Sequence, residues 1–184
     1  MAHYLALFRG INVSGKKIIK MEELRKLMEQ AGYGNVKTYI QSGNVVFSSN
    51  EKSKDKLAKA IEKLIDNKYG FDVTVFVIDK KHLEKAVDNN PYAEGKTPEE
   101  AGTKKIYVTF LSEKPSDEGM EKLSQAPIGE DEIALHEDIL YFRLAMGAAD
   151  SKLSNNLIES KLKLKATTRN WNTTLKLLEM MRGF

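Results

Sequence analysis

The stretch VKTYIQSGNVVFSS, residues 36–49, decides the fold that we expect for this chain. Its β-branched and aromatic residues predict two strands, Val36–Ile40 and Asn44–Ser48, and Ser42-Gly43 between them predicts a tight turn. A helical pattern lies on each side of this hairpin, with a further predicted strand beyond each helix. The order β-α-β-β-α-β is typical of a split ferredoxin-like arrangement, an antiparallel sheet with two helices on one face.

The elements around the hairpin are predicted from hydrophobic spacing. Before it, His3–Phe8 predicts a short strand, and MEELRKLMEQAG (21–32) predicts a helix that ends at a glycine. After it, KDKLAKAIEKLIDNKYG (54–70) predicts a second helix that ends at a glycine. The segment FDVTVFVID (71–79) is apolar on both sides, which predicts a covered, central strand.

A second half follows a short predicted helix, Lys80–Val87, and a turn-rich loop. Its predicted order, β-α-β-β-α-α, repeats part of the first half, although no residue-level repeat is present. The predicted elements are a strand at KKIYVTFL (104–111), a helix at Ser116–Ser124, a hairpin turning near Glu137-Asp138, and helices at Ser154–Leu162 and Thr168–Met181. We therefore expect an α+β fold with three parts: a ferredoxin-like domain at 1–88, a linker loop at 89–104, and a smaller α+β subdomain ending in helices at 105–184.

The composition excludes several classes of protein. A hydrophobic content of 41% and a charged content of 30% are those of a soluble globular chain, and no apolar run approaches the length that spans a bilayer. We see no signal peptide at the N-terminus. The chain has no cysteine, which excludes disulfides, thiolate catalysis and cysteine-based zinc sites. We expect a cytoplasmic protein with no membrane partner.

Charge is distributed unevenly along the chain, although the net charge of the whole is only +3. Residues 1–50 carry a net charge of +4 and residues 151–184 one of +5, whereas residues 51–150 carry −6. If the two ends meet, they form a positive face for a phosphate-bearing partner. Scattered, solvated lysines are the alternative interpretation.

The segment GINVSGKK, residues 10–17, matches the phosphate-loop pattern G-x-x-x-x-G-K. The match fails after Lys16, because Lys17 stands where a Ser or Thr would hold Mg²⁺, and the following IIKM does not open a helix at once. We therefore expect a basic, flexible loop that can contact an anion, not a nucleotide-hydrolysing site.

The segment QSGNVVF, residues 41–47, lies where an RNA-recognition domain carries stacking aromatics. Asn44, Val45 and Val46 follow Gly43 instead, so the stacking platform is missing. We favour a hairpin in which Gly43 supplies a positive φ and Asn44 bonds its own backbone.

No metal or cofactor site is expected. The histidines, His3, His82 and His136, lack a second ligand at helical spacing, and GEDE (129–132) is typical of a solvated turn. Ser151-Lys152 are adjacent in the chain, which is poor geometry for a nucleophile and its base.

The segment ATTRNWNTTLKLLEM, residues 166–180, supports two interpretations. Thr168 is predicted to cap the last helix, which places Arg169 in its first turn, where a cation opposes the helix dipole. An anion held there by Arg169 and the two asparagines would remove this conflict. Alternatively, Arg169 pairs with a carboxylate and Trp171 is a packing anchor. Two faces are predicted on this helix: Trp171, Leu175 and Leu178 on one, and Arg169, Asn172, Thr173 and Lys176 on the other.

Three segments in this order, residues 7–47, DSKLSN (150–155) and ATTRNWNT (166–173), resemble the bacterial family called domain of unknown function 1697. The resemblance implies an α+β fold with ferredoxin-like elements, and it implies no established activity, cofactor or catalytic residue. Its recurring motifs fall on Arg9, Gly10, Asn12, Lys16, Gln41, Ser42, Gly43, Asn44, Ser151, Lys152, Thr168, Arg169, Asn170, Trp171, Asn172 and Thr173.

These motifs lie in the two basic ends, and we hypothesise that they converge on one positive cleft between the halves. The leading hypothesis is a binding protein for an anionic ligand, either nucleic acid or a phosphorylated small molecule. The alternatives are a hydrolase or transferase acting on a phosphate-bearing substrate, and a structural or oligomerising protein. The candidate ligand-binding residues are Arg9, Asn12, Lys16, Gln41, Ser42, Asn44, Lys152, Thr168, Arg169, Asn170 and Asn172.

Overall fold

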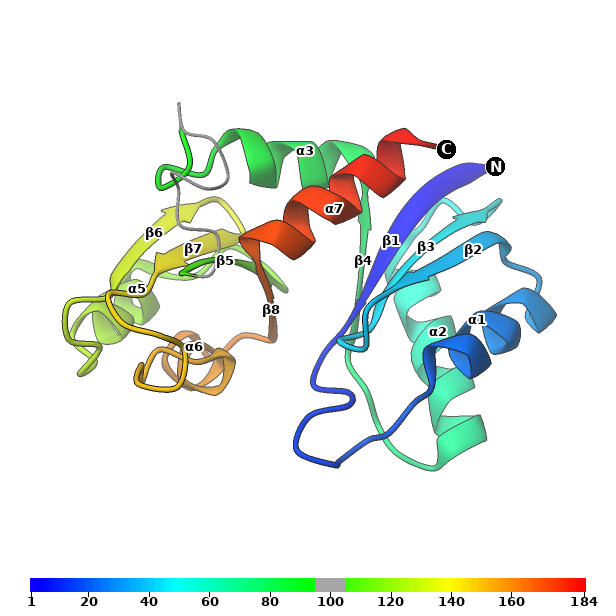
Figure 1. Cartoon of the computed structure of the whole chain (residues 1–184), viewed down its shortest axis with the longest axis horizontal. Coiled ribbons are helices and arrows are strands. Elements are labelled where there is room, and N and C mark those ends of the chain that lie inside the picture. The colour runs from blue at the N-terminus through cyan, green and yellow to red at the C-terminus, as the bar shows by residue number, and fades with distance from the viewer. Residues whose placement is uncertain (95–104) are drawn as a thin grey trace. The chain divides into compact units, whose positions relative to one another are not determined.

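The computed structural model describes residues 1–94 and 105–184, which form two antiparallel sheets of the same topology, each with helices on one face. The predicted α+β fold with a ferredoxin-like first half is therefore confirmed (Figure 1). Within the described residues, no helix is long and apolar enough to cross a membrane.

The first sheet has the strand order β2-β3-β1-β4. Helices α1 and α2 cover one of its faces (Figure 1). The elements of this half are β1 (Ala2–Phe8), α1 (Met21–Gln30), β2 (Gly34–Tyr39), β3 (Asn44–Ser49), α2 (Lys54–Tyr69), β4 (Val75–Asp79) and α3 (Lys80–Asp88). The prediction of a central strand at 71–79 is wrong, because β4 pairs only with β1 and lies at the edge of the sheet. Its apolar residues are explained by burial of both its faces, not by a central position.

The second sheet repeats this topology with the order β6-β7-β5-β8. Its helices α5 and α6 pack together on one face (Figure 1). The elements are β5 (Ile106–Leu111), α5 (Asp117–Ser124), β6 (Glu132–His136), β7 (Ile139–Arg143), α6 (Asn155–Leu162), β8 (Ala166–Asn170) and α7 (Trp171–Arg182). In each half a helix follows the last strand directly, so the halves share the order β-α-β-β-α-β-α.

The predicted helix Thr168–Met181 is wrong at its start. Residues 166–170 form strand β8, and the helix begins at Trp171. The β-branched residues Thr167 and Thr168 suit an extended backbone, and pairing with β5 satisfies their main-chain groups. The predicted order β-α-β-β-α-α therefore omitted one strand.

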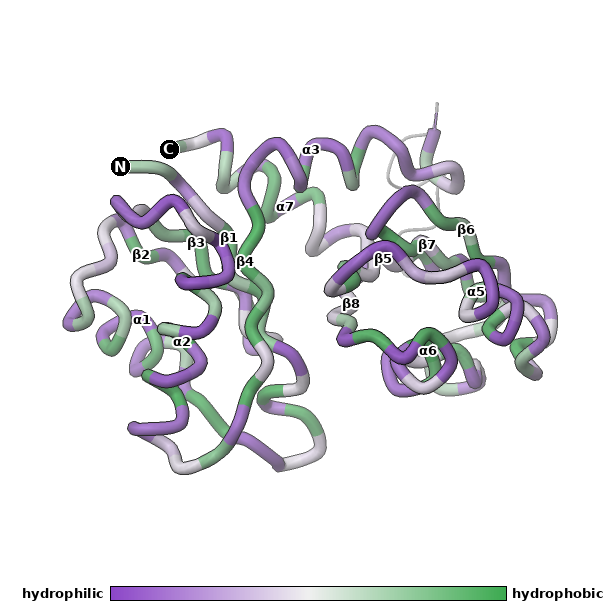
Figure 2. The backbone as a smooth tube through the Cα atoms, turned by 180° about the vertical axis from the view of Figure 1, so that it is seen from behind, coloured by the Kyte–Doolittle hydropathy of each residue, from purple (hydrophilic) through white to green (hydrophobic). Residues whose placement is uncertain are grey.

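Local sequence explains why the elements begin and end where they do, as α2 shows. Ser53 caps its N-terminus by accepting a hydrogen bond from the Lys56 amide at 3.3 Å, and Gly70 ends it with a left-handed φ of 73°. Its residues Leu57, Ile61 and Ile65 are buried against the sheet. Figure 2 shows the resulting alternation of hydrophobic and hydrophilic residues along α1 and α2.

Each half has its own hydrophobic core between its sheet and its pair of helices. In the first, Phe8 and Phe47 from the sheet meet Leu24 and Ile61 from the helices. In the second, Leu140 and Phe142 meet Leu123 and Ile158. The helix-facing residues alternate along the strands with residues on the opposite face.

The chain forms two compact units that do not follow the order of the sequence. One comprises residues 1–83 together with 177–184, and the other comprises residues 84–176. In the first unit the Phe184 ring packs against His3 on β1 at 4.8 Å between ring centroids. In the second, the Tyr141 hydroxyl donates a hydrogen bond to the Ala86 carbonyl of α3 at 2.8 Å. The predicted linker, 89–104, lies outside the described residues from residue 95 onward.

Candidate functional site

The segment 9–20, between β1 and α1, is held in shape by Asn12. The Asn12 side chain donates to the carbonyls of Ile19 at 2.9 Å and Gln41 at 2.8 Å, and it accepts the Ile19 amide at 2.8 Å. Asn12 itself has a φ of 56°, which asparagine tolerates better than most residues. These three bonds make Asn12 a scaffold for the loop and attach it to the β2–β3 turn.

The β2–β3 turn confirms the hairpin interpretation of QSGNVVF. Gly43 has a φ of 80°, and a Cβ there would lie 2.6 Å from the Phe8 Cβ. The Gly43 carbonyl accepts the Phe8 amide at 2.8 Å. Asn44 is fully buried, and its amide donates to the Tyr39 carbonyl and the Ser42 hydroxyl, both at 2.9 Å. Asn44 therefore orients the turn from inside the protein.

The first half of the predicted site is thus brought together within one unit. Arg9 precedes the loop, Lys16 lies exposed at its tip, and Gln41 and Ser42 lie in the turn to which Asn12 connects it. Residues 9–20 contain four cations and no acid, namely Arg9, Lys16, Lys17 and Lys20. Lys17 and Lys20 were not among the predicted candidates, although the absence of acids in this segment is visible in the sequence.

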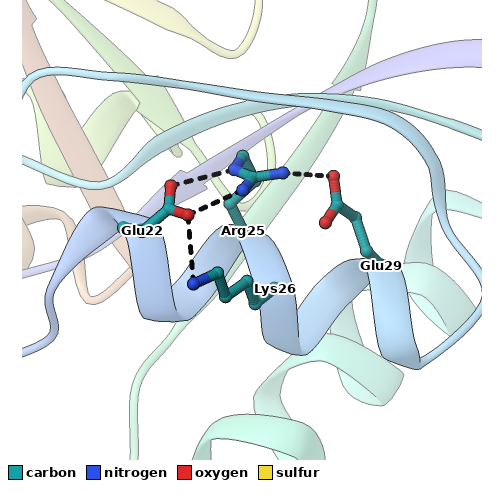
Figure 3. A network of polar contacts seen from close by, with 4 residues as sticks. All are labelled: Glu22, Arg25, Lys26 and Glu29. Atoms are coloured by element: carbon teal, nitrogen blue, oxygen red, sulfur yellow. Dashed lines mark hydrogen bonds and ion pairs between the residues drawn. The ribbon is translucent and has the colours of Figure 1, made fainter.

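Glu22 and Glu29 on α1, which follows the loop, have cationic partners on the same helix (Figure 3), whereas Glu23 lies 3.6 Å from Lys20 of the loop. Arg25 bonds to Glu22 at 2.7 Å and to Glu29 at 2.6 Å, and Lys26 lies 3.4 Å from Glu22. The hydrogen bond from Arg25 lowers the pKa of Glu22 to about 2. The Glu22 carboxylate is therefore paired within α1, beside the basic loop.

The second half of the predicted site lies in β8 and the start of α7, and its hydroxyl groups are used internally. The Thr168 hydroxyl lies 2.8 Å from that of Thr109 on β5 and donates to the Asn155 side chain on α6 at 2.9 Å. The Asn155 amide in turn donates to the Ala166 carbonyl at 3.0 Å. Thr168 therefore ties α6 to β5 and β8, and the prediction that it caps a helix is wrong.

Arg169 lies on β8, not in a helix, and is almost fully buried, with 7% of its surface exposed. Its register partner is Val108, whose partner on β7 is Tyr141, so these residues form a row on the sheet face opposite α5 and α6. The Arg169 guanidinium donates to the Thr167 hydroxyl and the Thr168 carbonyl, both at 2.9 Å. Burial lowers the pKa of Arg169 to about 10. The predicted conflict with the helix dipole does not arise, because Arg169 is outside the helix.

Asn170 caps helix α7. Its side-chain oxygen accepts the Thr173 amide at 2.8 Å, and its carbonyl accepts the Thr174 hydroxyl at 3.0 Å. Trp171 is buried, as a packing anchor would be, whereas Asn172 is exposed. Burial does not follow the two predicted faces of this helix, because Thr173 is buried and Leu175 is only half-buried. Arg169, which the prediction placed on the polar face, lies in β8 and outside the helix.

Lys152 lines a cleft of about 420 Å³ between the loops 127–131 and 145–152. Asp131 holds these loops together, because its carboxylate accepts the Ala145 amide at 2.8 Å and the Ser151 hydroxyl at 2.5 Å. The Ser151 hydroxyl thereby donates to a carboxylate and also accepts the Leu153 amide at 3.0 Å. Ser151 therefore stabilises the loop, and Lys152 is the cation at the rim of the cleft.

In the described ranges, no group of three or more His, Asp or Glu side chains is placed to hold a metal ion. The predicted ligand-binding residues carry cations, amides and hydroxyls, and the cleft beside Lys152 is also lined by Glu130, Asp131 and Asp150. The convergence of the two motif clusters in one cleft stays a prediction.

Comparison with known proteins gives the family and the fold. The sequence profile described as "Protein of unknown function (DUF1697)" matches residues 1–141. The chain belongs to the DUF1697 family. The matched part of this DUF1697 protein contains the loop 9–20 and the β2–β3 turn, whereas Lys152 and the ATTRNWNT segment lie beyond it. No curated protein matches the chain.

A solved structure, "conserved bacterial protein SP0830 from Streptococcus pneumoniae", has the same fold with a TM-score of 0.72. The alignment covers 97% of this chain and 98% of that one, at 23% sequence identity. At this identity the likeness shows the fold alone. It extends over both halves, so the repeated α+β architecture is shared.

Proposed function

We propose that this DUF1697 protein binds an anionic ligand in the bacterial cytoplasm, either nucleic acid or a phosphorylated small molecule. The loop 9–20 makes the main contact. The observation that carries the proposal is the acid-free segment with four cations, whose backbone Asn12 fixes by three hydrogen bonds. A cationic loop that is already ordered loses little conformational entropy when it binds phosphate.

Lys16 and Arg9 supply the charge in this proposal, and Gln41 and Ser42 in the neighbouring turn supply polar groups that orient the ligand. A second cluster is also predicted to contact the ligand. Its members are Lys152, Thr168, Arg169, Asn170 and Asn172. The bonds made by Thr168 and Asn170 support a structural role for those two residues. The proposal therefore places most weight on the first cluster.

An enzymatic function, as a hydrolase or transferase of a phosphate-bearing substrate, is less well supported. Such an enzyme needs a general base beside the reacting group. The loop 9–20 and the turn 39–44 contain no His, Asp or Glu. Their amides and cations suit binding better than proton transfer.

A thermal-shift series tests the proposal with sulfate, tripolyphosphate, nucleotides, sugar phosphates, and short RNA and DNA. A ligand at a hundred times its dissociation constant adds roughly 2.7 kcal/mol of stability. We expect the wild type to be stabilised, Lys16→Glu to lose most of the shift, and the control Lys59→Glu, an exposed lysine on α2, to keep it. No shift with any anion, or equal shifts in both variants, would contradict the proposal.

A further inference from the structure

The tip of the basic loop is a miniature β-ribbon, residues 12–17. Val13 and Lys16 form an antiparallel bridge, and the Lys16 amide donates to the Val13 carbonyl at 2.9 Å. The two residues between them, Ser14 and Gly15, have φ values of 49° and 72°, as in a type I′ turn. The Asn12 amide donates to the Lys17 carbonyl at 3.2 Å and extends the ribbon by one pair.

The two sides of this ribbon differ. Asn12 and Lys17 form one pair, and both side chains are held by the protein: Asn12 by Ile19 and Gln41, and Lys17 by the Asp72 carbonyl. The bridged pair, Val13 and Lys16, is exposed and forms the free side of the ribbon. One side of the ribbon is therefore anchored and the other is free for a partner.

The free side combines aliphatic groups with the cation of Lys16. Val13 is 57% exposed and Ile18 is 55% exposed. Residues 13–18 are all exposed, so the ribbon projects and does not line a pocket. Small ligands bind in concave sites that bury most of their surface. A projecting surface of this kind suits an extended polyanion.

We propose that the ribbon docks in a groove of duplex nucleic acid, with Lys16 on a phosphate and Val13 and Ile18 against base edges. This inference rests on the proposed function and deepens it. A two-stranded ribbon fits the major groove of DNA, and aliphatic side chains contact thymine methyl groups. Single strands are bound mainly by stacking on aromatic side chains, and residues 9–20 contain none. An anionic membrane is the rival surface, but interfacial docking favours aromatic residues and leucine, which are also absent from this segment.

Fluorescence anisotropy with a labelled duplex of roughly 20 base pairs, about two helical turns, tests the inference on the full chain. Binding is measured between about 50 mM and 200 mM salt, where phosphate contacts weaken most visibly. We expect Lys16→Ala to reduce the slope of log K against log salt by about 1, and Lys59→Ala to leave it unchanged. Val13→Ser should weaken binding on the order of tenfold with the slope unchanged, because it removes only apolar contact. Met146→Ser, at another exposed apolar side chain, is its control.

The same titrations with the single strand and with phosphatidylserine vesicles separate the outcomes. Tighter binding to either of these than to the duplex would overturn the inference, as would a Val13→Ser variant that binds like wild type. If tripolyphosphate stabilises the protein but the duplex does not bind, the inference fails while the proposed function stands. If neither binds, both fail.

Discussion

Asn12 and Gly43 fix the basic loop and the turn beside it, although neither is charged. The side-chain amide of Asn12 donates to the Ile19 and Gln41 carbonyls, and its oxygen accepts the Ile19 amide. Gly43 lets the β2–β3 turn lie against Phe8 and Ile11, where a Cβ would come within 2.7 Å of either side chain. Single residues therefore decide how the cations of segment 9–20 are presented.

The role of Gly43 predicts a severe effect of Gly43→Ala. The new methyl group meets buried side chains, and the φ of 80° is strained for any residue with a Cβ. We expect a loss of roughly 2–4 kcal/mol in the free energy of urea unfolding, from backbone strain and overpacking together. Gly15→Ala is the matched control, because its φ of 72° is similar but no atom lies within 4 Å of the added Cβ. Equal losses in the two variants would show that close packing at Gly43 is unimportant.

At the scale of elements, the two halves use the same device where a strand passes directly into a helix. Asp79 at the end of β4 accepts the His82 amide at 2.8 Å, and Asn170 at the end of β8 accepts the Thr173 amide at 2.8 Å. Burial raises the pKa of Asp79, but the bonds from His82 and Lys54 outweigh it and hold the pKa below its usual value. A short polar side chain thus ends the strand and caps the helix in both halves.

The capping role of Asn170 predicts that its effect on stability depends on its acceptor oxygen. Asn170→Ala should cost about 1 kcal/mol, and Asn170→Asp should retain most of the stability because aspartate caps equally well and favours the helix dipole. Urea unfolding of the two variants against wild type measures this. Thr168→Val gives a contrasting case, because it removes the bond to Asn155 and leaves the cap intact. A large loss in Asn170→Asp would argue that the amide nitrogen, not the oxygen, matters.

The ion network on α1 predicts a response to acid (Figure 3). The hydrogen bond from Arg25 lowers the pKa of Glu22 from 4.5 to about 2 in the folded protein. A carboxyl group with a depressed folded-state pKa stabilises the fold above its unfolded value, and that contribution is lost as the pH falls from about 4.5 towards 2. We expect the protection factors of the α1 amides, which are exchange rates corrected for the intrinsic pH dependence, to fall over this range in the wild type and much less in Glu22→Gln. A carboxyl resonance of Glu22 that titrates near 4.5 would contradict the pairing.

At the scale of the whole molecule, the compact units do not coincide with the two sequence halves. Residues 177–184, which end the second half, belong to the first unit, and residues 84–88 of α3 belong to the second. Leu177, Leu178 and Met181 are almost fully buried. The first unit is therefore complete only when the C-terminal segment is present.

Because residues 177–184 belong to the first unit, a destabilising substitution in this part of α7 should affect the first unit. Leu177→Ala should cost roughly 2–5 kcal/mol, as for other fully buried leucines, and the loss should appear as faster amide exchange in β1 and β3 of the first unit. Leu175→Ala, half-buried on the same helix but within the second unit, should cost less and leave those strands protected. Loss of protection confined to the second unit in Leu177→Ala would contradict the assignment.

Much of the fold was predictable from local pattern, and the reasons are visible in particular elements. The hairpin around Gly43 was predicted from its turn residues, and α2 from its hydrophobic spacing and final glycine. The strand β8 was missed because Thr-Thr-Arg-Asn, residues 167–170, is short and precedes a strong helical pattern. The edge position of β4 was missed because hydrophobicity reports burial of the faces, not hydrogen-bonding neighbours.

In the candidate site, too, some features could be predicted from the sequence and others depend on tertiary contacts. The sequence alone identified the polar motifs and a basic loop at residues 10–17, because charge and residue type are properties of the chain itself. Only the tertiary structure decided what each polar group bonds to: Asn12 and Asn44 to loop and turn backbone, Asn170 to the first turn of α7. It also decided that Arg169 is buried on a sheet, because strand pairing between β5 and β8 joins segments that no local pattern connects. Local periodicity sets the elements, whereas register and burial arise from contacts between residues far apart in the sequence.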